Sequence, residues 1–179
     1  MKIKHSYILF LLPSLLLIHS CKKVEDLLNF SFNIKNEFKL PPNIPINTPF
    51  DIPSIPLDYN SAETFEQNNT RADLVREIKL EYIKLMITEP SGQDFTFVKD
   101  IELNLTLDGK DPKLVAWKYD VSDDTGQELD LDVTQDALDE YLKSEDVGFS
   151  LKVTTDKFTT KEIKISSDIR ARVKANVFN

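Results

Sequence analysis

The chain has 179 residues, of which 22 are lysine or arginine and 30 are aspartate or glutamate, so its formal net charge at pH 7 is −8. This acidic balance argues against a nucleic-acid partner, because proteins that bind nucleic acid neutralise its phosphates with a basic patch. The only histidines are His5 and His19, and the only cysteine is Cys21. If the residues before Cys21 are removed by processing, the remaining chain has no imidazole. This excludes Ser-His-Asp and Cys-His catalysis and the usual zinc sites.

The first 20 residues have the order of a lipoprotein signal peptide. Lys2 and Lys4 precede an apolar stretch of about 12 residues (7–18), which is too short to span a membrane. Residues 17–21, Leu-Ile-His-Ser-Cys, resemble a bacterial lipobox, although His19 stands where a small residue is more usual. The alternatives are a plain signal peptide that is cleaved elsewhere and an uncleaved anchor.

The resemblance implies cleavage between Ser20 and Cys21, and a Cys21 that carries a diacylglycerol on sulfur and an N-acyl chain such as palmitate on its amine. It implies no other cofactor. Several acyl chains hold a protein stably at a membrane surface, whereas one chain gives only marginal binding. The charged residues 22–26 are similar to the start of surface lipoproteins of the Bacteroidota. We therefore expect an outer-membrane protein, on the surface or the periplasmic side, with a tether at 21–26 and one domain at 27–179.

Apolar and polar residues alternate with period two through most of this domain, which predicts antiparallel strands with one buried face. A phase change predicts a bulge at Tyr82-Ile83, and the length of the last strand predicts a bend or bulge near Ser166-Ser167. The expected strands cover residues 30–38, 77–88, 101–107, 113–119, 129–133, 147–153 and 163–177.

Two short helices are expected in the connections. Thr70 with Asp73 three residues later predicts a helix through about Arg76, and Thr134 is expected to cap a helix over 135–143 whose Ala137, Leu138, Tyr141 and Leu142 face the sheets.

Six of the nine prolines lie in residues 41–56, which excludes a central strand there. This segment is either a stiff spacer or an irregular edge segment, and its apolar residues favour the edge segment. Together these features predict an all-β fold, an antiparallel immunoglobulin-like β-sandwich with one or two short helices in its connections. Residues 83–87 and 95–101, with the block near Tyr141, are similar to β-sandwich lipoproteins of the Bacteroidota, a similarity that implies no reaction.

Three groups of residues are candidate binding sites. Trp117 and Tyr119 would form a platform for a sugar if exposed, but their shared strand side with Val115 favours a place in the core. A basic stripe is formed by Arg170, Arg172 and Lys174. It contacts lipid headgroups or a partner, or it pairs with acidic residues on neighbouring strands. We favour the cross-strand pairing. An acidic face is a candidate calcium site, although it lacks the EF-hand spacing and a solvated strand face explains it better. This face comprises Asp123, Asp124, Glu128, Asp130 and Asp132.

These features favour binding over catalysis. The leading hypothesis is a non-enzymatic lipoprotein that is attached to the membrane and acts as a binding or accessory subunit of an envelope protein assembly. A second hypothesis is a surface module that captures glycan or another nutrient. A third is a carboxylate-dependent hydrolase, which would need two carboxylates that converge in a cleft.

Overall fold

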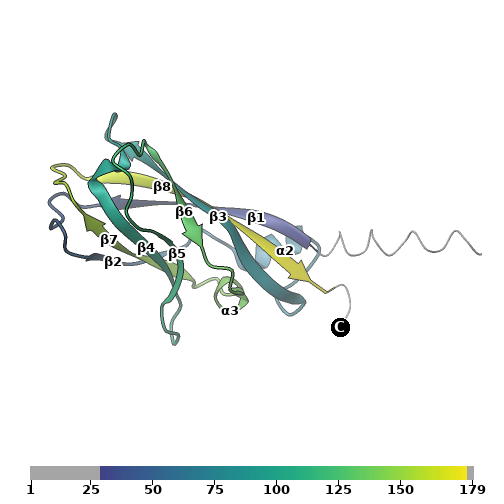
Figure 1. The fold of residues 1–179 in the computed structure, drawn as a ribbon. Helices are drawn as coiled ribbons and strands as arrows, with labels where there is room; N and C mark the ends of the chain where they lie inside the picture. Colours follow the sequence, from purple (N-terminus) through teal and green to yellow (C-terminus); the bar gives the residue numbers. More distant parts are fainter. Residues whose placement is uncertain (1–28, 177–179) are drawn as a thin grey trace, which may run out of the picture.

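The computed structural model describes residues 29–176, which form one antiparallel sheet of eight strands in the order β1-β8-β3-β6-β5-β4-β7-β2 (Figure 1). The all-β antiparallel prediction is confirmed, whereas the immunoglobulin-like division into two sheets stays a prediction, because hydrogen bonds link all eight strands in one series. The elements are β1 (Asn29–Leu40), β2 (Phe50–Pro56), α2 (Ser61–Gln67), β3 (Val75–Glu89), the 3-10 helix η1 (Phe95–Phe97), β4 (Val98–Thr106), β5 (Lys113–Lys118), β6 (Glu128–Val133), α3 (Asp139–Leu142), β7 (Gly148–Thr155) and β8 (Ile163–Ala175).

A long ladder of β1, β8 and β3 gives the molecule two distinct ends. β8 pairs with β1 as far as Asn29↔Lys174, and with β3 from Val75↔Ala175 to Glu89↔Lys164. We call the end at Asn29 and Ala175 the near end and the end at Glu89 and Lys164 the far end. Thirteen residues at about 3.3 Å each separate them by about 40 Å. The described chain thus starts and finishes at the near end (Figure 1).

Irregularities of this ladder lie in β3 and not in β8. The predicted bulge at Tyr82-Ile83 is found one residue earlier, where the register shifts between Leu80 and Tyr82. β8 has no bulge near Ser166-Ser167, because the strand continues without interruption and its pairing with β1 shows no register shift; a bend there stays a prediction. The extra residues of β3 accommodate the twist that a long strand pair accumulates.

Side chains from the two halves of the sheet meet in a common core. The rings of Phe38 in β1 and Phe149 in β7 lie edge to face with centroids 5.8 Å apart. Buried Asn36 of β1 donates to the carbonyl of Pro56 and accepts from the amide of Asp58, at 3.0 and 2.9 Å. These bonds hold β1 beside the end of β2, although the two strands stand at opposite ends of the strand order.

Tyr59 closes this core next to α2. Its ring stacks on Phe32 with centroids 5.1 Å apart, and its hydroxyl donates to the carbonyl of Leu142. Burial raises the pKa of the Tyr59 hydroxyl well above its usual range, so this group remains a hydrogen-bond donor at any ordinary pH.

The proline-rich segment belongs to the folded body. Residues 50–56 form edge strand β2, which pairs with β7, and Ile44, Ile52 and Leu57 are buried. The edge position agrees with the prediction, because a proline has no amide hydrogen to give to a second neighbouring strand.

Both predicted helices differ from the observed ones. No helix begins at Thr70: residues 72–74 form a turn, Asp73 binds Arg71 instead of capping, and β3 starts at Val75. The observed α2 lies earlier, and its start carries a capping signal that the sequence reading missed, since the Asn60 side chain accepts from the Glu63 amide.

The second predicted helix is much shorter than expected. Thr134 accepts from the Asp136 amide in a turn, and α3 begins only at Asp139. Leu138, Tyr141 and Leu142 are buried as predicted, whereas Ala137 is exposed because it precedes the helix.

We predict that Gly148→Ala destabilises the protein through the β2–β7 pairing. A Cβ at this position would lie 2.6 Å from Ser54 Oγ and 2.8 Å from the Ile55 carbonyl oxygen, so the backbone of β2 would have to move. Urea unfolding should show a loss of about 1–3 kcal/mol in unfolding free energy. Gly126→Ala is the control, because its Cβ would meet no atom within 4 Å, and equal stability of the two variants would contradict this account.

Candidate functional site

The predicted lipid anchor lies outside the described residues. Ser20 and Cys21 fall within residues 1–28, so the cleavage site, the lipid and the membrane location stay predictions. In residues 29–176, no helix combines the length and the apolar character that a membrane crossing requires.

Trp117 and Tyr119 are on the solvent side of β5, so the favoured interpretation that they belong to the core is wrong. The register between β4 and β5 shifts from Leu103↔Ala116 to Asn104↔Leu114, which leaves Val115 as an extra residue. Val115 and Ala116 are consequently both buried, and the alternation is inverted beyond them. Trp117 is partly exposed, and Tyr119 and Leu114 are 47% and 38% exposed. We call Leu114, Trp117 and Tyr119 the β5 surface.

Carboxylates flank the β5 surface on the neighbouring strands. Trp117 pairs with Glu102 of β4 and with Asp132 of β6, and paired residues of an antiparallel sheet point to the same side. The Tyr119 hydroxyl donates to Glu102 Oε1 at 2.9 Å, and this bond to a carboxylate raises the pKa of the tyrosine. Glu102 also lies 3.7 Å from the ammonium of Lys152. The aromatic rings are therefore fixed among charged groups.

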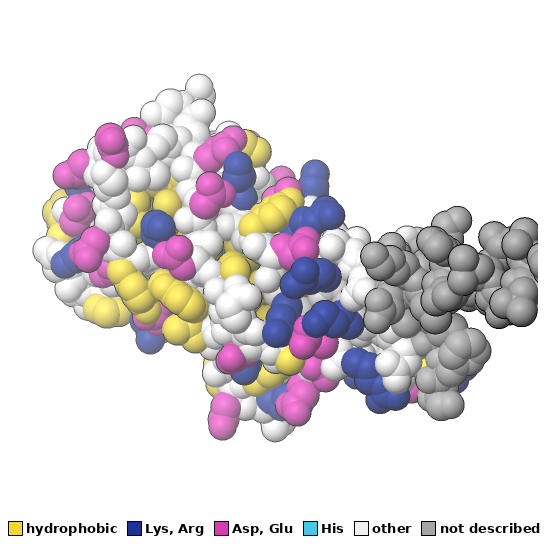
Figure 2. All heavy atoms as spheres, turned by 45° about the vertical axis from the view of Figure 1, so that its right-hand side comes forward, with side chains coloured by type: hydrophobic (Ala, Val, Ile, Leu, Met, Phe, Trp, Pro, Cys, Tyr) yellow, Lys and Arg dark blue, Asp and Glu magenta, His cyan; other side chains and the backbone are white. Residues whose placement is uncertain are grey.

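The negative charge of the described chain is concentrated in the segment that contains β4, β5, β6 and α3. Residues 94–146, which include β4, β5, β6 and α3, contain 16 acidic and 5 basic residues. Residues 29–93 and 147–176 together contain 12 acidic and 13 basic residues, so they are close to neutral. Figure 2 shows hydrophobic side chains grouped among charged ones away from the grey segment, and Lys and Arg side chains gathered next to it.

The five carboxylates of the predicted acidic face do not converge. Lys84 binds Glu128 and Asp130 at 3.0 and 3.9 Å, and the proximity of Glu128 raises the pKa of this lysine. Asp132 lies 3.4 Å from Lys118. Asp123 is paired with Lys157, and Asp124 accepts from Ser122. Across residues 29–176, no three His, Cys, Asp or Glu side chains are grouped so that they could hold a metal ion.

The basic stripe of β8 pairs across strands, as predicted. Glu81 of β3 lies 2.9 Å from Arg170 and 3.9 Å from Arg172, and Glu77 lies 2.9 Å from Lys174. The bond from Lys174 lowers the pKa of the Glu77 carboxyl. Because both carboxylates are occupied by β8 cations, the stripe is part of a cross-strand ionic network.

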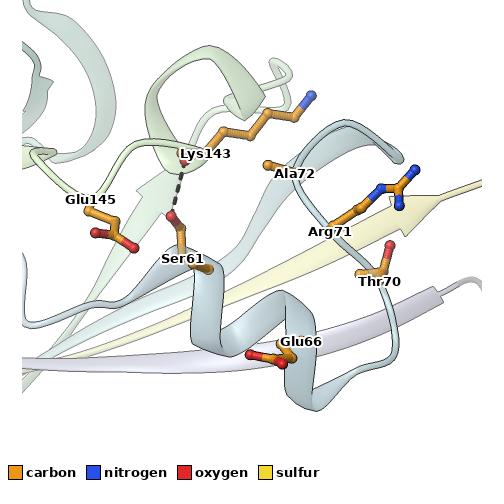
Figure 3. A pocket seen from close by; sticks show the side chains of 8 residues that line it. Ser61, Glu66, Thr70, Arg71, Ala72, Lys143 and Glu145 are labelled. Carbon is orange, nitrogen blue, oxygen red and sulfur yellow. Dashed lines mark hydrogen bonds between the residues drawn. The ribbon is translucent and has the colours of Figure 1, made fainter.

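A pocket of about 490 Å³ lies at the near end between α2 and the chain that follows α3 (Figure 3). Its charged groups are already engaged or diverge. Ser61 donates to the Lys143 carbonyl, the Lys143 ammonium donates to the Val75 carbonyl, and Arg71 binds Asp73. In Figure 3 the carboxylates of Glu66 and Glu145 lie on different sides of the pocket, so they do not share a common target.

A second hollow of about 480 Å³ lies between β1 and β2, over Phe38 and Ile55. Both lysines beside it are ion-paired, Lys39 with Glu162 at 2.7 Å and Lys164 with Glu89 at 2.8 Å. The hollow thus offers an apolar floor without an unpaired cation at its rim.

No protein-family model matches this chain, and no curated protein matches it either. Its function therefore has to be inferred from the chemistry of its own surface.

We predict that acrylamide quenches the fluorescence of Trp117, the only tryptophan of the chain, in the folded protein. The reason is that the bulge at Val115 places the indole on the solvent side of β5. The Stern–Volmer constant of the folded protein should be a substantial part of the value in urea. A value near zero before unfolding would place Trp117 in the core and contradict the observed register.

Proposed function

We propose that this protein is a non-enzymatic lipoprotein of the outer membrane that binds another envelope protein through its β5 surface. The observation that carries the proposal is the exposure of Leu114 and Tyr119 beside a partly exposed Trp117, on the outer side of bulged strand β5 and at its end. Folding normally buries such side chains, and burial of each contributes about 1.5–3 kcal/mol. Because the bulge keeps these side chains in contact with solvent, the free energy of their burial can stabilise a complex with a partner instead of the fold.

The composition of the β5 surface favours a protein partner. Stable protein interfaces combine aromatic anchors at their centre with a charged rim, and tryptophan and tyrosine are prominent among the residues that dominate binding energy. Here the rim holds Glu102, Asp132 and Lys152. The excess of acidic residues in 94–146 indicates a partner whose matching face is basic.

The proposed anchor is compatible with the geometry of the near end. Eight peptide units separate Cys21 from Asn29, so an extended chain would span at most about 29 Å. Because β1 starts at the near end, a lipid on Cys21 would keep this end close to the membrane.

A second candidate function is the capture of glycan on the same surface. The observation in its favour is the position of Trp117 beside Glu102 and Asp132, which gives an aromatic face with hydrogen-bond acceptors on both neighbouring strands. The two functions differ in their response to salt, since binding of a basic protein weakens as ionic strength rises and binding of a neutral glycan does not.

We predict that a photo-cross-linker at position 114 of the lipidated protein, in its own cells, captures a defined envelope protein. Position 86 is the matched control, because Met86 is 43% exposed on the other half of the sheet. Trp117→Ala and Tyr119→Ala should each weaken binding by about 30-fold, as expected for central aromatic anchors, and so reduce the adduct. High salt should reduce it further. Equal adducts from positions 114 and 86, or none, would contradict the proposal.

A separate prediction concerns the anchor. Cys21→Ser should move the protein from the membrane fraction to the soluble fraction and abolish incorporation of labelled palmitate, because no sulfur remains to be lipidated. His19→Ala is the control, since it keeps the cysteine and supplies the small residue that a lipobox usually has. Retention of the Cys21→Ser protein in the membrane fraction would refute the lipid anchor.

A further inference from the structure

Two loops form a pocket at the far end of the molecule, remote from the place where the chain enters the sheet. One loop joins β3 to η1, and the other joins β7 to β8. The pairing Glu89↔Lys164 and the 2.8 Å ion pair between these residues hold the two loops together at their base. Residues 90–93 and 158–161 line a pocket of about 280 Å³. This volume is at the lower limit for ligand sites and suits a single ring.

The pocket combines one exposed ring with unpaired polar groups. Phe158 is 71% exposed, the highest value among the exposed large hydrophobic residues of the described chain, the others being 37–47% exposed. Within residues 29–176, the side chains of Ser91, Thr160 and Lys161 make no hydrogen bond or ion pair. Thr159 is buried beside them, and its hydroxyl has no hydrogen-bond partner among the described residues.

Lys161 gives the pocket a preference for negative charge. The neighbouring lysines are neutralised, Lys157 by Asp123 and Lys164 by Glu89, whereas the ammonium of Lys161 is unpaired in the described region. A carboxylate that binds an ammonium forms a charge-assisted hydrogen bond, which is about twice as strong as a neutral one. The hydroxyls of Ser91 and Thr160 can donate to or accept from a hydroxyl-rich ligand.

We propose that the far-end pocket binds an acidic sugar, that is, a single ring with several hydroxyls and one carboxylate. The face of the ring lies on Phe158, the carboxylate binds Lys161, and the hydroxyls bind Ser91 and Thr160. This site is built from different residues than the β5 surface, so it does not depend on the proposed protein partner. If Cys21 holds the near end at the membrane, the pocket lies about 40 Å farther out along the ladder, where a soluble or polymeric sugar has access.

The test is a saturation-transfer NMR titration of the lipidated protein in detergent with two probes, methyl β-D-glucuronide and methyl β-D-glucoside. The glucuronide should bind, and the glucoside should bind about tenfold more weakly, which is the ratio expected for one charge-assisted hydrogen bond. Lys161→Gln should remove this difference, and Phe158→Ala should abolish binding of both probes. Because Phe158 is mostly exposed, its removal should leave the far-ultraviolet circular dichroism unchanged.

Matched controls separate this site from the rest of the surface. Lys35→Gln removes another exposed lysine without an ion pair in the described region, and Met86→Ala removes another exposed apolar side chain. Both variants should bind the glucuronide as the unchanged protein does. Equal binding of the two probes, no saturation transfer from the glucuronide, or unchanged binding after Phe158→Ala would overturn the proposal. Loss of glucuronide binding in Trp117→Ala alone would move the sugar site to the β5 surface.

Discussion

One inserted residue, Val115, determines what the protein presents to its surroundings. If β5 had no bulge and continued the Asn104–Leu114 pairing regularly, Trp117 and Tyr119 would point into the core together with Val115. The register shift buries Val115 and Ala116 in succession and turns both aromatic side chains to the solvent. The bulge thus leaves the Trp117 ring partly exposed and the Tyr119 ring 47% exposed, although burial of such rings is favourable. Such an exchange is expected where a protein needs a binding face.

The β1–β8–β3 ladder provides the rigid frame on which this surface and the far-end pocket are carried. It brings Asn29 and Ala175 to one end and the loops at Glu89 and Lys164 to the other. Charge is distributed unevenly along the chain, with an acidic excess in 94–146 and a near balance in the other described residues. An anchored protein with this layout would hold its near end at the membrane, while the acidic β5 surface and the far-end pocket remain available to partners.

The parts of the fold that follow from local alternation could be predicted from the sequence. Period-two patterns located seven of the eight strands, because a strand with one buried and one solvent-exposed side has alternating apolar and polar residues. Edge strand β2 could be inferred only as an edge segment, since its prolines conceal the alternation. The helix predicted at Thr70 failed because a capping spacing is also found in turns, whereas the true signal, Asn60 with Glu63, lay next to the proline-rich stretch.

The candidate sites depended on features that local patterns do not contain. A bulge in β5 is a relation between two strands, so Val115-Ala116-Trp117 alone does not reveal which residue is inserted. The far-end pocket requires the loop at 90–93 to meet the loop at 158–161, a contact between segments far apart in the chain. The cross-strand pairing of the β8 cations could be predicted, because charged side chains on the solvent-exposed side of adjacent strands lie next to each other.

The most direct test of the account is the β4–β5 register in solution, measured from cross-strand nuclear Overhauser effects between backbone protons. The bulge requires contacts that pair Leu103 with Ala116 and Asn104 with Leu114, with Val115 opposite no residue of β4. A regular register that continues the Asn104–Leu114 pairing, with Leu103 opposite Val115 and Ile101 opposite Trp117, would return Trp117 to the core and remove the surface on which the proposed function rests.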